Sequence, residues 1–475
     1  MAQCRPATRR RTHSRITRRL AGSRTSSKDV ALASLVRLTA LALARAMLAG
    51  PRTADGLAAR MRTCLAAEAV WCTAIAERCA TMPGERWRRL DVRSLATLVE
   101  HDEGFADAWH QPDPPYPRRY LLREATGMQP LPVGLDRCQV PYWPHAGALA
   151  QWFGIRWPAL WRLTRPAAWQ RRRPEEHQHY EARRIPKRTG GTRLLEVPAP
   201  YLKALQRRVL DDLLDRIPPH EAARGFMRER SVVDHARAHC GQRVVLRFDL
   251  RDFFSRVRAS RVHALFETLG YSDEVARTLT ALCTTATPEP VLQRLRREDG
   301  MPWETAQWLR EPHLPQGAPT SPALANLCAF RLDLRLDGLA FTLGATYTRY
   351  ADDLVLSGPS HLKTSFARIE RQVKRIAAEE GFALNVRKTR CLGAGRRQAV
   401  CGIVVNERPN LPREAFDRLK AILHACVRDG PAGHNREGHA DWQAHLRGRV
   451  AWATQLNPAK GARLARMFER ITWTD

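Results

Sequence analysis

Two adjacent aspartates stand between two runs of strand-forming residues, and this arrangement constrains the fold more than any other feature of the chain. Residues 347–358 (YTRYADDLVLSG) read as a β-hairpin with Asp352 and Asp353 at its tip. Earlier in the chain, residues 244–250 (VVLRFDL) read as a buried strand that delivers Asp249 near its end. The pattern predicts neighbouring strands that bring three carboxylates together.

Three carboxylates on neighbouring strands suit a site for divalent metal ions. Adjacent acids in an apolar setting repel each other and are costly to bury, and a bound cation removes that cost. Mg²⁺ favours oxygen ligands, and two ions about 3.5–4 Å apart can hold the attacking and departing oxygens in phosphoryl transfer. The alternative is a pair of turn aspartates with an unrelated strand-end aspartate, which is the ordinary interpretation of an isolated Asp-Asp pair.

The charge of the chain points to a polyanionic partner. Its 475 residues include 78 Lys and Arg against 48 Asp and Glu, a net charge of +30. The longest apolar stretch, residues 30–50, contains Arg37 and Arg45, which favours a buried helix over a membrane span. The 11 cysteines form no Cys-x-x-Cys pair and no signal peptide is evident, so we expect reduced thiols and a cytoplasmic protein.

Composition divides the chain into regions. Residues 1–28 carry nine Lys or Arg and no acid, which predicts a disordered basic arm. Helical spacing follows, with a break near Gly50 and Pro51, and residues 29–170 are predicted to form a helical N-terminal extension. The tryptophans of this extension indicate either a nucleic-acid stacking surface or packing. The remaining regions are residues 171–405, which contain the aspartates, and residues 406–475, where the spacing is again helical.

Several motifs, taken in order and spacing, resemble those of reverse transcriptases. They are IPKRTGGTR at 185–193, DLRDFF at 249–254, LPQGAPTSP at 314–322, YADD at 350–353 and GFALNVRKTR at 381–390. The resemblance implies an α/β right-hand polymerase fold with a helical N-terminal extension. Residues 171–405 would form the fingers and palm, and residues 406–475 a helical thumb that recognises RNA.

Within that superfamily the chain looks most like bacterial retron reverse transcriptases of the myxobacterial type, which carry an N-terminal extension. The narrower resemblance rests on RGF at 224–226, RSVV at 230–233, QAVCGIVVN at 398–406 and QLNPAKG at 455–461. Two segments depart from the retron pattern. Residues 235–239 (HARAH) stand where Asn-Ala-x-x-His is typical, and residues 400–402 (VCG) stand where Val-Thr-Gly is typical. These departures bear on RNA recognition rather than on polymerase activity.

The two histidines of the HARAH segment, His235 and His239, are four residues apart and stand beside Cys240. A helix could use this spacing to bind zinc, but no further ligand pair is evident. The pattern therefore favours contact with RNA, or an ordinary helix face, over a metal site.

The resemblance also implies the role of each site residue. Asp249, Asp352 and Asp353 would hold two Mg²⁺ ions, and Lys388 would protonate pyrophosphate. Phe254 would be the steric gate that selects dNTPs. The remaining substrate-binding residues are those expected to contact the nucleotide, the template backbone and the triphosphate: Gln316, Gly317, Lys187 and Arg193.

The function implied is RNA-directed DNA polymerisation by a retron enzyme. Such an enzyme copies part of a cognate structured non-coding RNA, which is both template and primer, into RNA-linked single-stranded DNA. Synthesis starts at an internal guanosine 2′-hydroxyl, commonly in anti-phage defence, and an effector protein is a further expected partner beside dNTPs and the RNA–DNA duplex. The alternatives are another bacterial defence-associated or group II intron-like reverse transcriptase, and a non-catalytic RNA-binding scaffold.

Overall fold

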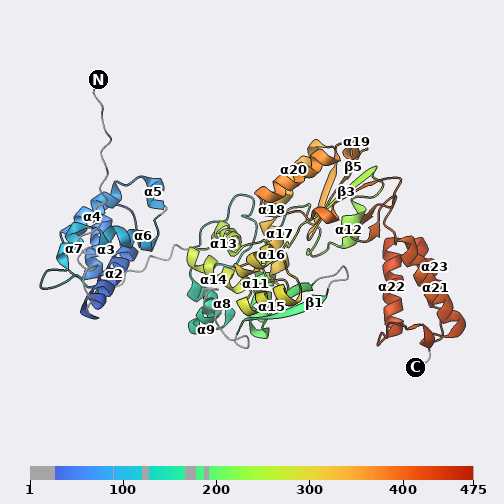
Figure 1. Ribbon diagram of the computed structural model, residues 1–475, viewed down its shortest axis with the longest axis horizontal. Coiled ribbons are helices and arrows are strands. Elements are labelled where there is room, and N and C mark those ends of the chain that lie inside the picture. The colour runs from blue at the N-terminus through green and yellow to red at the C-terminus, as the bar shows by residue number, and fades with distance from the viewer. Residues whose placement is uncertain (1–26, 89, 120–127, 166–177, 187–191, 474–475) are drawn as a thin grey trace, which may run out of the picture. The chain divides into compact units, whose positions relative to one another are not determined.

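The computed structural model describes residues 27–88, 90–119, 128–165, 178–186 and 192–473 (Figure 1). By its internal contacts the chain divides into two compact units, residues 1–126 (unit 1) and residues 127–475 (unit 2). Most of the expected basic arm lies outside the described residues, as does the expected boundary at residues 170 and 171. Within the described parts of the chain, no helix combines the length and apolarity that a membrane span requires.

Unit 1 is helical, as the sequence predicts. Its helices are α2 (Ser27–Leu48), α3 (Ala54–Leu65), α4 (Trp71–Ala80), α5 (Gly84–Arg88), α6 (Val92–Glu100) and α7 (Glu103–Ala108). Side-chain caps begin three of them, because Thr53, Asp91 and Asp102 accept backbone N–H groups of α3, α6 and α7. Their apolar faces enclose one core that includes Leu43, Met61 and other small or aliphatic side chains.

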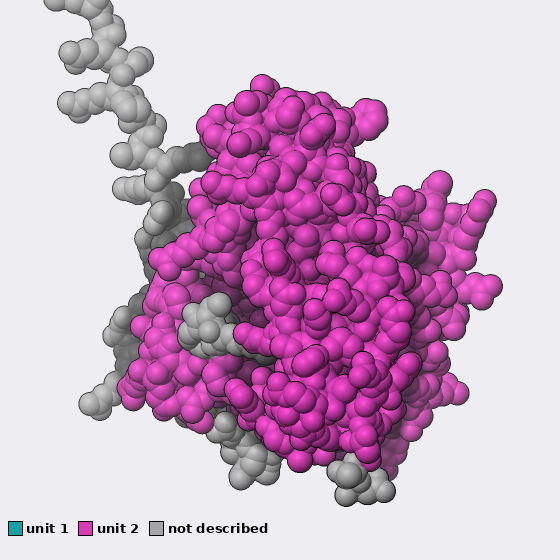
Figure 2. Space-filling model, turned by 90° about the vertical axis from the view of Figure 1, so that its right-hand side faces the viewer, with its two compact units in different colours: residues 1–126 teal, residues 127–475 magenta. Residues whose placement is uncertain are grey.

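Unit 2 (magenta in Figure 2) holds all the described strands. Its first half contains α8 (Ala146–Phe153), α9 (Trp157–Leu163), β1 (Tyr180–Pro186), β2 (Thr192–Pro198), α11 (Pro200–Asp212), η2 (Leu214–Arg216), α12 (Val232–Arg237), β3 (Val244–Asp249), α13 (Ala259–Thr268), α14 (Asp273–Cys283), α15 (Glu289–Glu298) and α16 (Trp303–Arg310). Its second half contains α17 (Ser321–Cys328), α18 (Phe330–Thr342), β4 (Thr346–Tyr350), β5 (Asp353–Gly358), α19 (His361–Thr364), α20 (Phe366–Glu379), η3 (Val386–Lys388), β6 (Arg390–Gly393), β7 (Ala399–Val400), β8 (Ile403–Val404), α21 (Arg413–Asp429), η4 (Ala432–His434), α22 (Trp442–Leu456) and α23 (Pro458–Phe468).

The tryptophan-rich segment belongs to the core of unit 2. Helices α8 and α9 pack in the same apolar cluster as α11 and α14. Trp143 is buried there and stacks on Tyr271 at 5.3 Å between ring centroids. Trp157 and Trp161 are exposed. Packing therefore accounts for Trp143, whereas those two rings remain on the surface.

A four-stranded antiparallel sheet, here called the palm sheet, has the order β4-β5-β3-β6. Because side chains alternate along a strand, its two faces differ. One face carries Phe248, Leu354 and Leu356, which join the main core beside α20. The other face carries Val245 and Val355, which pack against α12. Asp249 and Asp353 share this second face by the same alternation.

The C-terminal helices α21, α22 and α23 form their own small apolar core (Figure 1). The sequence predicts helical spacing through residues 442–468, and the structure divides this stretch at Asn457. The Asn457 side chain accepts the backbone N–H of Lys460 and Pro458 occupies the first turn of α23, so the chain ends one helix and starts the next.

Candidate active site

The structure brings the three predicted aspartates to one end of the palm sheet. Asp249 ends β3 and is paired in register with Asp353, which starts β5. Asp352 lies in the turn between β4 and β5, and its backbone carbonyl accepts the N–H of Leu250 at 2.8 Å. Hydrogen bonds between backbones therefore fix the spacing of the three residues before their side chains contribute.

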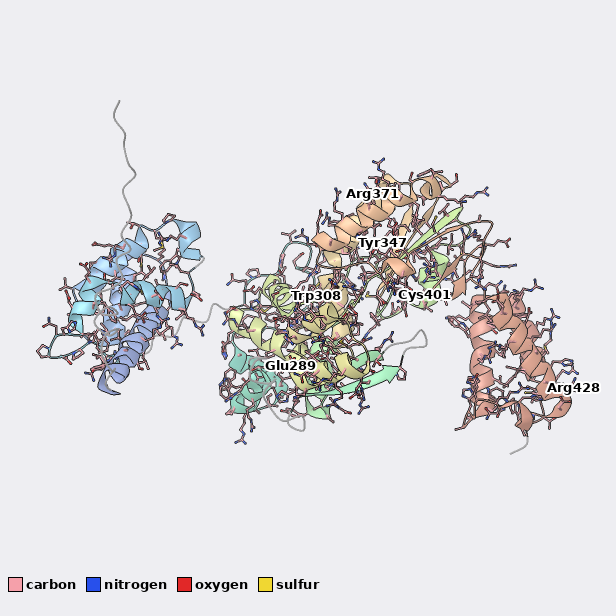
Figure 3. All side chains as sticks on the ribbon, viewed as in Figure 1. Glu289, Trp308, Tyr347, Arg371, Cys401 and Arg428 are labelled. Atoms are coloured by element: carbon pink, nitrogen blue, oxygen red, sulfur yellow. The ribbon has the colours of Figure 1, made fainter. Side chains whose placement is uncertain are left out.

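The aspartates are surrounded by groups that favour negative charge. Lys388 Nζ lies 2.8 Å from Asp249 Oδ2, and a nitrogen of Arg247 lies 3.4 Å from Asp353 Oδ1. The Cys401 thiol donates to Asp353 Oδ2 at 3.3 Å. Cys401 is labelled in Figure 3. The fold thus surrounds the acids with hydrogen-bond donors that lie far from them in the sequence.

The pKa values of Asp352 and Lys388 are both shifted by their surroundings. Burial first, and then the negative charge of Asp249, raise the pKa of Asp352 above its ordinary value. The hydrogen bond to Asp249 raises the pKa of Lys388, so this amine stays protonated at neutral pH. The site is therefore a partly buried cluster of acids with a protonated amine beside it.

The donor chemistry fits a divalent metal. Carboxylate oxygens are the ligands that Mg²⁺ prefers, and a cation would relieve the repulsion that raises the pKa of Asp352. Among the described residues, a set of three ligand atoms within 4.8 Å of one another is formed by His263, Glu267 and Asp273 and not by these aspartates. The three aspartates thus supply the right atoms, held apart and engaged by Lys388 and neighbouring groups.

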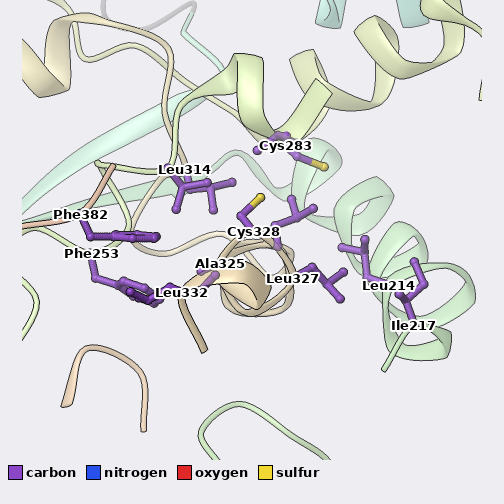
Figure 4. Close-up of a cluster of buried hydrophobic side chains, with 14 of the residues drawn as sticks. Leu214, Ile217, Phe253, Cys283, Leu314, Ala325, Leu327, Cys328, Leu332 and Phe382 are labelled. Atoms are coloured by element: carbon purple, nitrogen blue, oxygen red, sulfur yellow. The ribbon is translucent and has the colours of Figure 1, made fainter. Parts of the chain in front are cut away.

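Aromatic rings stand on the segments that flank the three aspartates and lie close to one another. Phe253 is buried and stacks on Phe382 at 5.6 Å between centroids (Figure 4), which makes it a core residue. Phe254, the predicted steric gate, is less buried, and its ring lies 6.0 Å from that of Phe226. Phe226 is 46% exposed and lies 6.4 Å from Tyr350. The wall beside the acids therefore contains Phe226, a residue to which the sequence alone gives no role.

Strained backbone gathers in the same place. Phe226 and Ala351 both adopt positive φ, at 60° and 56°, a conformation that is rare for residues with a side chain. A Cβ on Gly225 would lie 2.8 Å from the backbone nitrogen of Ala351, so glycine is needed for this close approach. Strain of this kind clusters at functional sites because the surrounding structure holds it in place.

A buried ion pair supports the hairpin from behind. Arg349 in β4 and Asp333 in α18 are both fully buried, and Arg349 nitrogens lie 2.6 and 2.8 Å from the Asp333 carboxylate. Arg349 also donates to the carbonyl of Ala351 at 3.1 Å. Sequence reasoning missed this residue, although an arginine among the threonines and tyrosines of a strand next to the paired aspartates was a signal that could have found it.

The two histidines of the HARAH segment are buried beneath the hairpin. Thr348 Oγ1 lies 2.6 Å from His235 Nδ1 and 2.7 Å from His239 Nε2, and Ser357 Oγ lies 2.7 Å from His239 Nδ1. Burial is the main reason that the pKa of each histidine falls to about 3, so both are neutral. The two residues that depart from the retron pattern, His235 and Cys401, therefore contact β4 and β5 respectively, whereas His239 matches the pattern.

The predicted nucleotide-binding residues divide between two segments. Arg193 is exposed on β2. Gln316 and Gly317 lie in the loop before α17, where the carbonyl of Gln316 accepts the N–H of Glu196 at 2.9 Å. Lys187 lies outside the described residues. The structure thus joins β2 to the Gln316 loop by its backbone.

Comparison with known proteins gives a consistent family. The model described as "Reverse transcriptase (RNA-dependent DNA polymerase)" matches residues 185–401. Retron Mx65 reverse transcriptase of Myxococcus xanthus is 43% identical over 295 residues, 62% of this chain and 65% of that protein. Retron Ec86 reverse transcriptase of Escherichia coli is 31% identical over 280 residues, 59% of this chain and 76% of that protein.

Two further comparisons define the extent of the likeness. Retron Mx162 reverse transcriptase of Myxococcus xanthus is 39% identical over 61% of this chain, and the chain spans less than two thirds of each Myxococcus relative. A solved telomerase from Candida albicans in complex with a telomeric RNA fragment is 11% identical at a TM-score of 0.34, with 63% of this chain and 56% of that chain covered. Together with the palm sheet, the family match confirms the right-hand polymerase fold predicted from the sequence.

Proposed function

We propose that this chain, which belongs to the retron reverse transcriptase family, is an RNA-directed DNA polymerase. The observation that carries the proposal is the register pairing of Asp249 with Asp353, with Asp352 in the adjoining turn. This arrangement offers three carboxylates to metal ions at the end of a rigid sheet.

In this proposal the three aspartates hold two Mg²⁺ ions. When bound, the ions would stabilise the charge that develops on the attacking and departing oxygens during nucleotidyl transfer. Lys388 would hold a proton beside the pyrophosphate leaving group, and its bond to Asp249, which raises its pKa, keeps the amine protonated, as a general acid must be before it donates. The remaining work of the chain is to bind and orient the substrates.

Substrate selection would rest on the wall and the basic fingers. Phe254 would exclude a ribonucleotide 2′-hydroxyl, and Phe226 would support it from the side. Arg193 and Lys187 would neutralise the triphosphate, the Arg193 guanidinium through paired hydrogen bonds and the Lys187 ammonium as a compact positive charge. Gln316 and Gly317 would contact the incoming nucleotide and the template backbone.

The polymerase claim is tested by primer extension. Wild-type protein should add dNTPs to a DNA primer annealed to RNA when Mg²⁺ is present. Asp352→Asn and Asp353→Asn should abolish extension while the thermal unfolding midpoint is retained, and Asp337→Asn, an exposed aspartate on α18, should behave as wild type. Equal activity in the two site variants would overturn the assignment.

We further propose the product expected of a retron. The enzyme would copy a cognate structured RNA, starting at an internal guanosine 2′-hydroxyl, into RNA-linked single-stranded DNA, in a system that defends against phage with an effector protein. The basic C-terminal helices would bind the RNA through its shape and phosphates. The likeness to retron Mx65 and Ec86 reverse transcriptases supports this product.

Expression of the gene with its flanking DNA tests the product. Short nucleic acids would be resolved before and after ribonuclease and debranching treatment, with Asp352→Asn as the control. A short DNA whose mobility changes on debranching supports the retron product. Unbranched DNA alone would favour another defence-associated or intron-like reverse transcriptase, and no DNA at all would favour a non-catalytic scaffold.

A further inference from the structure

A buried ion pair links the two segments that the proposed function assigns to the incoming nucleotide. Glu196 follows Arg193 by three positions in β2, and His313 precedes Gln316 by three positions. Because side chains alternate along a strand, Arg193 is exposed while Glu196 points inward. Glu196 is 4% exposed and His313 is fully buried.

The contacts of His313 fix its protonation. Its Nε2 lies 2.9 Å from Glu196 Oε2, and its Nδ1 lies 2.7 Å from the backbone carbonyl of Glu311. A carbonyl and a carboxylate only accept hydrogen bonds, so both ring nitrogens donate and the pair is an imidazolium with a carboxylate. Burial opposes the charge on His313, but Glu196 outweighs it and the pKa of His313 is raised. The hydroxyl of Thr287 donates to the second carboxylate oxygen at 2.7 Å.

The backbone of Glu196 makes a second contact with the loop that contains Gln316 and Gly317. Its N–H donates to the carbonyl of Gln316 at 2.9 Å. Gly317 has a φ of +141°, and a Cβ there would lie 2.9 Å from the carbonyl oxygen of Glu196. The loop therefore rests directly on β2, and only glycine permits the approach. One strand residue thus secures the loop at position 313 by its side chain and at positions 316 and 317 by its backbone.

Stability does not explain a charged pair at this position. Desolvation of two buried ions commonly offsets their attraction, and apolar replacements of similar volume are often as stable. An apolar contact, however, has no preferred direction, whereas an ion pair with a third hydrogen bond fixes one geometry. The retained charges therefore indicate a positional role.

We propose that the Glu196–His313 pair is a positioning device that holds the Gln316–Gly317 loop against β2 and so sets the affinity of the enzyme for the incoming dNTP. The inference rests on the proposed polymerase function. The pair does not touch the reacting atoms, so it should act on nucleotide binding more than on the chemical step.

Steady-state incorporation of a single dNTP on an RNA template with a DNA primer tests the device. Glu196→Ala and His313→Ala should each raise KM for dNTP by about tenfold, the effect expected when a hydrogen bond to a charged group is removed, with kcat changed less than about threefold. Glu196→Gln keeps one acceptor oxygen for the Nε2–H of His313, and the Thr287 hydroxyl can accept from the new amide, so this variant should recover part of the affinity. The double alanine variant should be no worse than either single variant.

A matched control distinguishes displacement of the Gln316–Gly317 loop from a general loss of stability. Gln206 is fully buried in α11 and bonds to Tyr180 and to the Leu282 carbonyl, outside the loop. Gln206→Leu should lower the unfolding midpoint and leave KM unchanged. A second readout is hydrogen exchange of the Glu196 amide, which should accelerate in His313→Gln because its acceptor is on the loop.

Each outcome has a distinct meaning. Unchanged KM in both alanine variants, or a loss in kcat alone, would overturn the positioning role. If the alanine variants do not fold, unchanged amide exchange and unchanged KM in His313→Gln would overturn it equally. If the wild-type protein incorporates no dNTP, the proposed function itself fails first.

Discussion

Unit 1 and the palm sheet of unit 2 bury different kinds of side chain. Among the described residues of unit 1, the buried polar side chains are Thr39 and Asp102, and Asp102 caps α7 while it pairs with Arg78. Around the palm sheet, histidine, arginine, aspartate, serine and threonine are buried together. Burying polar groups costs stability unless every partner is supplied, so the palm retains them for a purpose that unit 1 lacks.

Backbone strain follows the same division. In the described part of unit 1, the non-glycine residue with positive φ is Ala66, at the end of α3. In unit 2, Phe226, Ala351 and Cys401 share this conformation, and all three lie near the hairpin that carries Asp352 and Asp353. Apolar packing therefore governs the fold of unit 1, whereas the palm also holds strained backbone and buried polar side chains, both of which cost stability.

Neutralising one acid in each unit should have different effects on activity and stability. Asp353→Asn should reduce dNTP incorporation by about a hundredfold to a thousandfold, because removing one group that stabilises charge at the reacting centre costs about that much. Asp102→Asn should leave incorporation unchanged and lower the unfolding free energy of unit 1 by about 1 kcal/mol. Primer extension and thermal unfolding of both variants would check this, and loss of activity in Asp102→Asn would refute the division.

Substitutions that create a cavity in either apolar core should lower stability in both units but lower activity only in unit 2. Leu43 in α2 and Leu356 in β5 are both fully buried, and truncation of either to alanine should cost about 2–5 kcal/mol in its own unit. Leu356→Ala should also lower incorporation, since β5 carries Asp353. Chemical denaturation followed by an activity assay measures both effects. An equal loss of incorporation in Leu43→Ala would contradict the comparison.

Acid should weaken unit 2 before unit 1. His235 and His239 have pKa values of about 3 in the folded chain against 6.5 when unfolded. Between these values the unfolded chain binds more protons, so stability is complete above pH 6.5 and falls as the pH drops. From pH 7.5 to 5.5 the loss should be about 2–3 kcal/mol for the two residues. His313 acts in the opposite sense, because its raised pKa adds stability as the pH falls towards 6.5 and offsets part of this loss, and its contribution is complete below 6.5.

Denaturation of the wild type and of His239→Gln at several pH values measures this dependence. The variant should lose about half of the slope that His235 and His239 contribute between pH 7.5 and 5.5, while the unit 1 transition serves as an internal reference. A slope that is the same in both proteins would remove the histidines from the explanation.

The smallest effect is expected from the basic arm, residues 1–28. Its deletion should weaken RNA binding and flatten the salt dependence, by about 0.7–0.9 in the logarithmic slope for each phosphate that the arm neutralises. Primer extension at low salt should be unchanged. Binding titrations across a range of salt concentrations would check this, and an unchanged slope would show that the arm does not bind RNA.

The sequence predicts local secondary structure and misses the side-chain contacts between segments that are distant along the chain. The strand ending in Asp249 and the hairpin around Asp352 follow from short patterns of apolar and acidic residues, which one sequence displays directly. The ion pairs of Arg349 with Asp333 and of Glu196 with His313 depend on which helix or strand faces which. A single sequence does not specify those pairings. For the same reason it does not reveal that the histidines of residues 235–239 are buried against the hairpin.

Primer extension by residues 127–475 alone, with and without Asp352→Asn, tests whether unit 2 carries the chemistry. If unit 2 carries the chemistry, this fragment should extend a DNA primer on RNA with Mg²⁺ at a rate close to that of the full chain, and the substitution should abolish extension. A fragment that unfolds cooperatively but extends no primer, or one that is indifferent to Asp352→Asn, would contradict the account.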